Sequence, residues 1–526
     1  MERGHPARSE RSARKKSPYG TASKTKCRII RIRFYTMEEI ELIDVMPDGE
    51  EVIVTAPPDE PKPAKKYDRS IIEGPLGSAV WKLAWPAILT NLFSGVQGWV
   101  DQIMVGNLMG YQANAAIGAA FQIFLLVIVF ISSVFIGMSV LVARFVGAND
   151  HERANRAVYQ GFLTALVISL GILAPVGYFS APYLLRLVSN DATVIAEALP
   201  FLRIMFVFSI GLMVYFMLSG ALRSAGDSRT PMVLGVIMTV LNLLFNIILI
   251  RGLGPIPAFG TAGAAMGTCL AAGLVGAYAI WRLIVGGWVV SFPKGGYAPD
   301  WKVIKQLFKF GLPAGFQGVA MNVGGVMMYW FMSSVAQSAA TQAVYAVSYS
   351  QLFSLVTWGS NALMGASAAV AGQNLGAGNP DRAKAAVNTA ARIGVAGAAF
   401  FGIFFFFFPA QLLGIFGMSD PEVIAIGTNL LRVLSVSGLF ISAALAYTGG
   451  LQGTGDTKSP MFISIISQVV LPLGICFVIS KTTTLVPMHI WIAILAGHMM
   501  RCTLSYLRFN QGKWRSIKVD MEHTAA

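Results

Sequence analysis

The stretch LSGALRSAGDSRTPM at residues 218–232 is matched, in register, by YTGGLQGTGDTKSPM at residues 447–461. The same glycine, aspartate and proline recur at equivalent positions: Gly226 with Gly455, Asp227 with Asp456, and Pro231 with Pro460. A second pair of segments, FVGANDHERA at 145–154 and NLGAGNPDRA at 374–383, has the same shift of 229 residues. Self-similarity over such long segments is typical of a duplicated unit, so the sequence predicts a chain built from two related halves.

The composition places most of the chain in lipid. Of its 526 residues, 55% are hydrophobic and 13% are charged, whereas a water-soluble domain carries about 25% charged residues. The formal net charge of +14 does not indicate nucleic-acid binding, because the basic residues collect in the first 36 residues and in short loops between apolar segments. We therefore expect a multi-pass membrane protein, monomeric in the lipid bilayer, with no nucleic-acid partner.

Twelve segments are apolar enough to cross a bilayer, which takes about 20 residues. They are predicted at 80–103, 117–141, 157–180, 200–222, 231–250, 262–285, 306–334, 342–370, 387–410, 427–448, 459–480 and 488–508. The repeat assigns six to each copy, and because six is even, both copies have the same orientation. The predicted fold class is all-α integral membrane: twelve transmembrane helices in two six-helix lobes related by a parallel, same-orientation internal repeat.

The predicted lobes occupy residues 73–290 and 291–510, and they are flanked by tails at 1–72 and 511–526. The first tail has too few clustered apolar residues for a core, and it contains the charged, proline-rich stretch APPDEPKPAKK. We expect it to be a disordered cytoplasmic tail. Two interpretations of its first 36 residues stay open: a basic arm that contacts anionic lipid, or a stretch that precedes a start of translation at Met37.

The distribution of basic residues predicts the orientation in the membrane. With the amino terminus inside, fourteen Lys and Arg residues fall in the inner loops and at most five in the outer loops. Basic loops are retained on the cytoplasmic side. We therefore expect both termini to be cytoplasmic and the chain to lie in the cell's inner (plasma) membrane.

A single acidic residue, Asp101, lies within a predicted span. A charged side chain at mid-span costs about 2.5–3.5 kcal/mol on insertion scales and usually faces a cavity or a partner. The equivalent position of the second copy is Met328, so the repeat itself does not require a carboxylate here. We predict that Asp101 binds an ion part-way through the membrane; the alternative is an interfacial position beyond a shorter span.

Polar residues at helical spacing accompany this carboxylate. Two polar faces result: Thr90, Ser94, Gln97 and Asp101 in the first span, and Thr239, Asn242 and Asn246 in the fifth. One carboxylate with several neutral oxygens suits sodium, with Asp101, Asn242 and Asn246 as the candidate ligands, whereas a partly desolvated carboxylate can carry a proton. Both ions stay open, as does simple hydrogen bonding between helices for the asparagines.

The seventh span is rich in methionine and aromatic residues, as in MNVGGVMMYWFM at 321–332. This composition suits an adaptable surface for apolar cations, although packing against protein or lipid is the alternative. The candidates for the substrate cleft are Ser94, Gln97, Gln317, Met321 and Met328. We assign no role to His489 and His498 of the last span.

Several motifs together resemble the multidrug and toxic compound extrusion (MATE) family, over about residues 74–510. They are GPLGSAVWKLAWPAI, VDQIMVG, the pair VGANDHERA and LGAGNPDRA, and the pair GDSRTP and GDTKSP. The resemblance implies two six-helix lobes around a central cleft, and export of organic cations and other amphipathic compounds by proton or sodium antiport.

The resemblance also implies roles for individual residues. Asp101 matches the coupling carboxylate, Asn242 and Asn246 match the polar pair of the fifth span, and Thr268 matches a hydroxyl of the sixth. Pro86 matches the proline at which the first helix is proposed to bend. Where some members carry an acid in the seventh span, this sequence has Met321, which is typical of the DinF-like branch, coupled through the first lobe.

The predicted function is that of a secondary active multidrug exporter with small-molecule substrates, no enzymatic activity, and no cofactor beyond the coupling ion. GTGDTKS at 453–459 does not fit a phosphate-binding loop, because its lysine follows a threonine. Two alternatives are weighed. A lipid-linked oligosaccharide flippase would show a strongly cationic central cleft, and few cations lie within the predicted spans. A membrane scaffold or receptor would not require Asp101.

Overall fold

The computed structural model describes residues 30–36, 39–45, 51–54, 68–109, 111–188, 191–517 and 519. The side chains of residues 30–54, and those of several residues between 96 and 132, Asp101 among them, lie outside this description. The chain divides into two compact units, residues 1–63 and residues 64–526, and each is considered by itself.

The first unit contains a three-stranded antiparallel sheet in the order β1-β2-β3, formed by Ile30–Thr36, Glu39–Val45 and Glu51–Val54. The sequence predicts a disordered tail at 1–72, and these strands differ from that prediction. Apolar residues alternate with charged ones in IRIRF and EIELI, and this period of two favours strands. The helical unit also begins inside the predicted tail, because α1 spans Ser70–Glu73. Apart from residues 68 and 69, the rest of that tail lies outside the described residues.

The second unit is all-α. The helices of its first half are α2 (Leu76–Met109), α3 (Tyr111–Gly147), α4 (His151–Leu166), η1 (Val167–Leu173), α5 (Ala174–Val188), α6 (Ala192–Val207), α7 (Ile210–Ser224), α8 (Arg229–Arg251) and α9 (Gly260–Val285). Those of its second half are α10 (Trp301–Ser333), α11 (Ser338–Tyr345), η2 (Ala346–Leu352), α12 (Ser354–Gly376), α13 (Pro380–Phe407), α14 (Pro409–Ile415), α15 (Pro421–Gly453), α16 (Lys458–Ile465), η3 (Ile466–Val470), α17 (Leu471–Thr482), α18 (Pro487–Asn510) and the 3₁₀ turn η4 (Lys513–Ser516).

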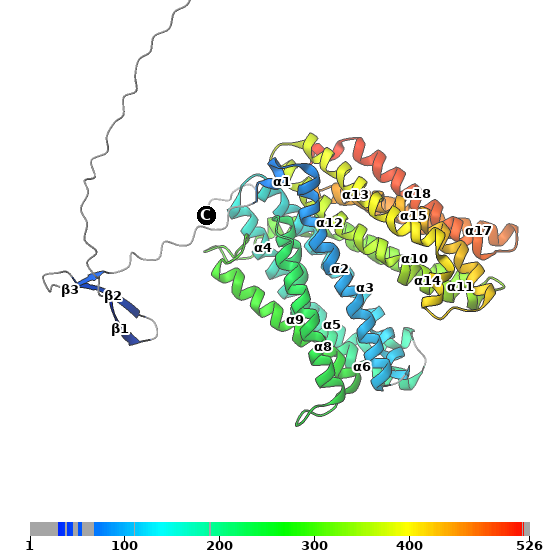
Figure 1. The fold of residues 1–526 in the computed structure, drawn as a ribbon, viewed down its shortest axis with the longest axis horizontal. Helices are drawn as coiled ribbons and strands as arrows, with labels where there is room; N and C mark the ends of the chain where they lie inside the picture. Colours follow the sequence, from blue (N-terminus) through cyan, green and yellow to red (C-terminus); the bar gives the residue numbers. More distant parts are fainter. Residues whose placement is uncertain are drawn as a thin grey trace, which may run out of the picture. The chain divides into compact units, whose positions relative to one another are not determined.

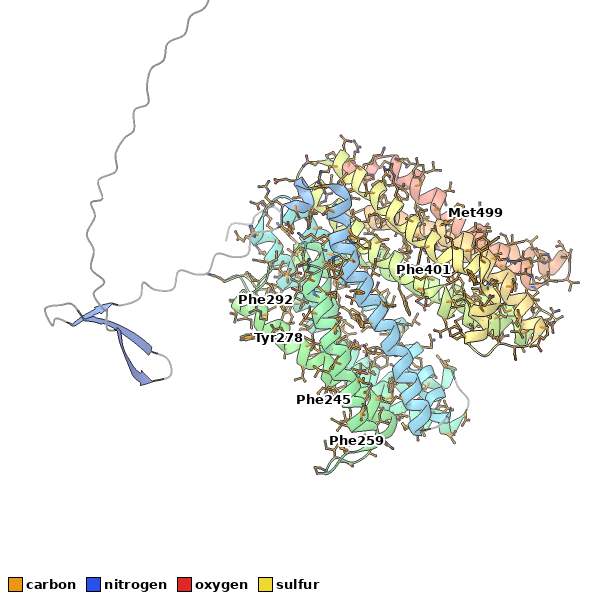
Figure 2. The ribbon with its side chains drawn as sticks, viewed as in Figure 1. Phe245, Phe259, Tyr278, Phe292, Phe401 and Met499 are labelled. Carbon is orange, nitrogen blue, oxygen red and sulfur yellow. The ribbon has the colours of Figure 1, made fainter. Side chains whose placement is uncertain are left out.

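Each of the twelve predicted spans coincides with one helix or one run of consecutive helices. Within the described residues, eight are long and apolar enough to cross a membrane, or nine if α6 and α7, which meet at a bend of 52°, form one span. The helices α2, α10 and α12 fall outside that set. They lie where the two halves meet, since α2 packs on α12 and α10 packs on α3. Aromatic side chains such as Phe259 and Tyr278 project from the outer edge of the first half (Figure 2).

The predicted repeat is confirmed at the turn that precedes α8 and α16. Gly226 and Gly455 have positive φ angles of 100° and 97°, a conformation that favours glycine. The carboxylate of the next residue, Asp227 in one copy and Asp456 in the other, accepts backbone hydrogen bonds of 3.0 and 3.2 Å from the third residue after it. The conserved register of the two copies therefore encodes the same helix start twice.

The first helix of each half begins in the core of the other half. Val80 and Leu83 of α2 are buried in one cluster with residues of α12, α13 and α15. Val303 and Leu307 of α10 are buried in the cluster that fills the first half. The predicted lobe boundary at residue 290 falls between α9 and α10 and stays a prediction, and the helices on its two sides share their cores.

Glycines bring the backbones of the two halves into direct contact. A Cβ added at Gly137 would lie 2.0 Å from the carbonyl oxygen of Leu307. Gly147 and Gly376 are equivalent in the repeat. A Cβ added at Gly147 would lie 2.0 Å from the carbonyl oxygen of Gln373, and one added at Gly376 would lie 2.1 Å from that of Arg144. The backbone contacts at Gly147 and Gly376 lie at the same end of the helices as α1 and η4. We call this end the closed end. Figure 1 shows the two sets of helices diverging away from it.

Side chains reinforce the closed end. Arg144 donates to the carbonyl oxygens of Thr454 (3.1 Å) and Ile517 (2.7 Å), and Gln373 donates to that of Ser224 at 2.7 Å. Ile71 of α1 is fully buried against Gly226. The closed end therefore joins both halves and both ends of the helical unit.

The carboxyl of Asp68, just ahead of α1, pairs with Lys82 of α2. Partial burial acts to raise the pKa of this carboxyl, but hydrogen bonds from Lys82 and Ser70 outweigh it, and the pKa lies below its usual value.

Replacing Gly376 by alanine should lower the thermal unfolding midpoint of the purified protein. The new methyl group meets a backbone carbonyl that cannot rotate away, and overpacking of this kind costs about 1–3 kcal/mol. Gly365, in the same helix, has no atom within 4 Å of an added Cβ, so Gly365→Ala should be neutral or stabilise by about 0.5–1 kcal/mol. Equal midpoints for the two variants would contradict the backbone contact at Gly376.

Candidate functional site

A hydrogen-bonded network joins α2, α8 and α9 within the first half. Gln97 donates to the amide oxygen of Asn242 at 2.9 Å and accepts from Thr239 at 2.8 Å. Asn242 in turn donates to the hydroxyl of Thr268 at 3.0 Å and accepts from Asn246 at 3.3 Å. The structure thus brings together five of the residues that the sequence placed on polar faces or assigned by resemblance.

The two asparagines are almost completely buried, with 1% and 2% of their surfaces exposed. Asn246 fits because the facing residue of α9 is Gly267, where an added Cβ would lie 2.1 Å from its side-chain oxygen. Buried amides are stable only when their donors and acceptors are satisfied. The network is therefore a built polar site within the first half.

Asp101 follows Gln97 by four residues in the unbroken helix α2. Its backbone lies about one turn beyond the network, whereas its side chain is outside the described residues. Its predicted role in ion binding, alone or with the two asparagines as sodium ligands, stays a prediction.

Pro86 lies inside α2, which continues as one helix from Leu76 to Met109. The hydroxyl of Thr90 bonds to the carbonyl oxygen of Pro86 at 2.8 Å. Further along, Asn91 donates to the carbonyl oxygen of Trp358 at 3.0 Å, and the Trp358 ring occupies the space where a side chain at Gly95 would be. In this conformation α2 is therefore in direct contact with α12 beyond the proline. The hinge role of Pro86 stays a prediction.

A cavity of about 390 Å³ lies mainly in the second half, with α3 of the first half along one side. Gln317 and Met321 line it, and their predicted role in the substrate cleft stays a prediction. Gln317 donates to the hydroxyl of Ser464 at 3.0 Å.

Two other cleft candidates lie elsewhere. Met328 is buried in the core of the second half with Phe331 and Met332, because at this level α10 is covered by α11. The prediction that Met328 lines the cleft is therefore wrong. Ser94 is exposed on α2 and does not line the cavity.

The sequence analysis overlooked the basic lining of this cavity. His498 and Arg501, both on α18, line it with 2% and 5% of their surfaces exposed. Arg501 lies within the predicted span 488–508, and an ionisable residue inside a span is itself a functional signal. The predicted site contains the acid within a span, Asp101, but neither Arg501 nor His498.

A duplicated two-lobed bundle with a polar site inside the membrane defines the class of secondary transporters. The MatE family model matches residues 86–248 and 313–478, one match in each half. The chain therefore belongs to the MATE family, as its motifs predicted.

Relatives and solved structures agree with this assignment. A probable multidrug resistance protein NorM of Thermotoga maritima is 26% identical over 441 residues, which cover 83% of this chain and 93% of the relative. The multidrug resistance protein MdtK of Yersinia enterocolitica is 25% identical over 438 residues, 81% of this chain and 93% of the relative. An outward-facing MATE transporter structure has a TM-score of 0.78 at 21% identity and covers 85% of this chain and 99% of its own.

Substituting Gly267 by alanine should displace the Asn246 side chain and disrupt the network. We expect loss of most transport together with destabilisation of about 1–3 kcal/mol, because a buried amide loses its geometry. Gly273, in the same helix, has no neighbour within 4 Å of an added Cβ, so Gly273→Ala is the matched control. Transport and thermal unfolding measured in parallel would decide, and normal transport by Gly267→Ala would count against a functional network.

Proposed function

We propose that the protein is a secondary active exporter of organic cations and other amphipathic compounds, driven by proton or sodium antiport through alternating access. The observation that carries this proposal is the match of the MATE family model to both halves of the chain. The names of the relatives, multidrug resistance proteins NorM and MdtK, support it. The flippase alternative is not favoured by these relatives.

Within this proposal, the network around Asn242 and Asn246 supports coupling through the first half. Asp101 takes up a proton or a sodium ion beside it, and neutralising this carboxylate releases the exported compound. An electrical potential of 100 mV contributes about 2.3 kcal/mol per charge moved across the membrane. The chain acts as a transporter rather than an enzyme, as a monomer, and with no cofactor beyond the coupling ion.

We place the protein in the inner membrane with both termini in the cytoplasm, on the basis of the basic inner loops. The closed end, which carries α1 and η4, then faces the cytoplasm. The conformation described here is accordingly the one in which the helices diverge toward the outside, ready to release substrate and to take up the coupling ion.

Replacing Asp101 by asparagine should abolish ethidium export from proteoliposomes, with a decrease of about tenfold or more in rate. The amide has the shape of the carboxylate, but it does not exchange a proton, and it has no negative charge to balance a sodium ion. Rates are measured with a proton gradient alone and with a sodium gradient alone, and the gradient that drives the wild type identifies the ion.

Asp191→Asn is the matched control for this variant. Asp191 is an exposed N-cap whose carboxylate accepts from the backbone of Thr193 at 2.8 Å, and asparagine caps helices about as well as aspartate. Export by Asp101→Asn at the rate of Asp191→Asn would remove Asp101 from the mechanism.

A further inference from the structure

The cavity of the second half carries positive charge without a matching acid. Arg501 and His498 lie three residues apart on one face of α18 and are buried at its wall. Among the described residues that line the cavity, none is acidic. Asp456 is the acid that α18 meets nearby, and it is paired with Arg508 at 2.8 Å, about two turns beyond Arg501. Arg501 therefore has no counter-charge within the described part of the chain.

Hydrogen-bond donors and acceptors at this wall are also left without partners. Within the described residues, Nε of Arg501, Nδ1 of His498 and Nε2 of Gln468 are buried and make no hydrogen bond. All three side chains line the same cavity. A buried donor without an acceptor destabilises the protein, and a charged donor does so more strongly. The Nε–H of the Arg501 guanidinium, together with the NH₂ of the Gln468 amide, calls for acceptor oxygens from a bound molecule.

An aromatic stack stands beside these donors. The ring of Tyr345 stacks on Tyr349, with centroids 4.7 Å apart and an angle of 9°, and on Trp491 at 6.1 Å and 6°. The His498 ring lies against Phe353 at 6.0 Å. Tyr349 lines the cavity, so a flat ring system can bind against this wall with its polar substituent directed at α18.

Two of the side chains that line the cavity belong to π-helical segments. Tyr349 belongs to η2 and Gln468 to η3, both of which interrupt helices of the second half. A π-helical turn shifts the residues that follow it around the helix axis, and such turns often occur at functional sites. The interruptions thus bring an aromatic ring and an amide to the same cavity as the Arg501 guanidinium.

We infer that this cavity binds the anionic oxygen group, a carboxylate or sulfonate, of a flat aromatic compound that the protein exports. The inference rests on the proposed function and specifies one class of its substrates. The planar guanidinium of Arg501 matches a carboxylate with two parallel hydrogen bonds, and Gln468 supplies a further donor. Aromatic zwitterions fit best, because their negative end occupies this cavity while the polar network of the first half stays free for the coupling ion.

The test compares two dyes with the same fused ring system: rhodamine 110, which has a free carboxylate, and rhodamine 123, its methyl ester. Equilibrium binding is measured by fluorescence polarisation with the full chain in nanodiscs of uncharged lipid. Wild type should bind rhodamine 110 about tenfold more tightly than rhodamine 123. Arg501→Gln should remove this preference by weakening rhodamine 110 about tenfold while leaving rhodamine 123 within about twofold.

Two further variants complete the design. Arg186→Gln, at an exposed arginine of α5, is the matched control and should bind both dyes like the wild type. Gln468→Leu should weaken rhodamine 110 selectively as well, and it replaces Arg501→Gln if that variant does not fold. In the absence of dye, Arg501→Gln should unfold at the wild-type temperature or above it, because a buried unpaired charge is removed.

The inference is overturned if the Arg501 and Gln468 variants weaken both dyes equally, or if the preference for rhodamine 110 survives in them. It is also overturned if anionic phosphatidylglycerol in the nanodiscs displaces rhodamine 110 alone, since the site would then belong to a lipid headgroup. If the wild type binds both dyes equally well, this inference is overturned, whereas the proposed export is unaffected. If the wild type binds neither dye, the proposed function and this inference fail together.

Discussion

The contact between glycine and a backbone carbonyl at the closed end determines how the two halves are held. Gly147 and Gly376 are equivalent in the repeat, and each approaches the partner helix so closely that no larger residue fits. Because the contact is between backbones, its geometry is independent of side-chain rotamers. Arg144, Gln373 and Ile71 then have fixed surfaces on which to bond and pack. The divergence of the helices away from this end follows from closure here (Figure 1).

The two halves share a backbone plan but differ in polar chemistry. In the first half, the amide of Gln97 on α2 bonds to Asn242 on α8, which also accepts from Asn246 of the same helix and donates to Thr268 of α9. At the positions equivalent to the two asparagines, the second half has Leu471 and Ile475, and its polar groups lie instead around a cavity in which several have no partner. The polar side chains of the first half thus bond mainly to one another, whereas those of the second half face a cavity. The two copies of the repeat have therefore diverged in their polar side chains while keeping the same backbone plan.

The fold could be predicted from the sequence because its signals are periodic. The repeat and the apolar segments depend on many residues at once, and all twelve segments coincide with helices. The polar faces of α2 and α8 were predictable for the same reason, since helical spacing alone places Gln97 and Asn242 on one side of each helix. Met328 could not be placed this way, because it is buried in a cluster that includes Leu430 and Trp491, which lie about 100 or more residues away in the sequence. The role of Arg501 depends on its distance from acids, and the π-helical turns that present Tyr349 and Gln468 alter the spacing on which such reasoning relies.

The exchange of first helices between the two cores has a consequence for biosynthesis. When α2 leaves the ribosome, Val80 and Leu83 have no core, because their partners in α12 and α13 follow almost 300 residues later. During this interval the apolar side chains at the start of α2 lack the protein side chains against which they pack in the finished fold. Because helices in a bilayer associate through close packing and hydrogen bonds, a chain that stops at residue 290 lacks the packing partners of these side chains. Synthesis of the second half is therefore also the folding step that completes the first.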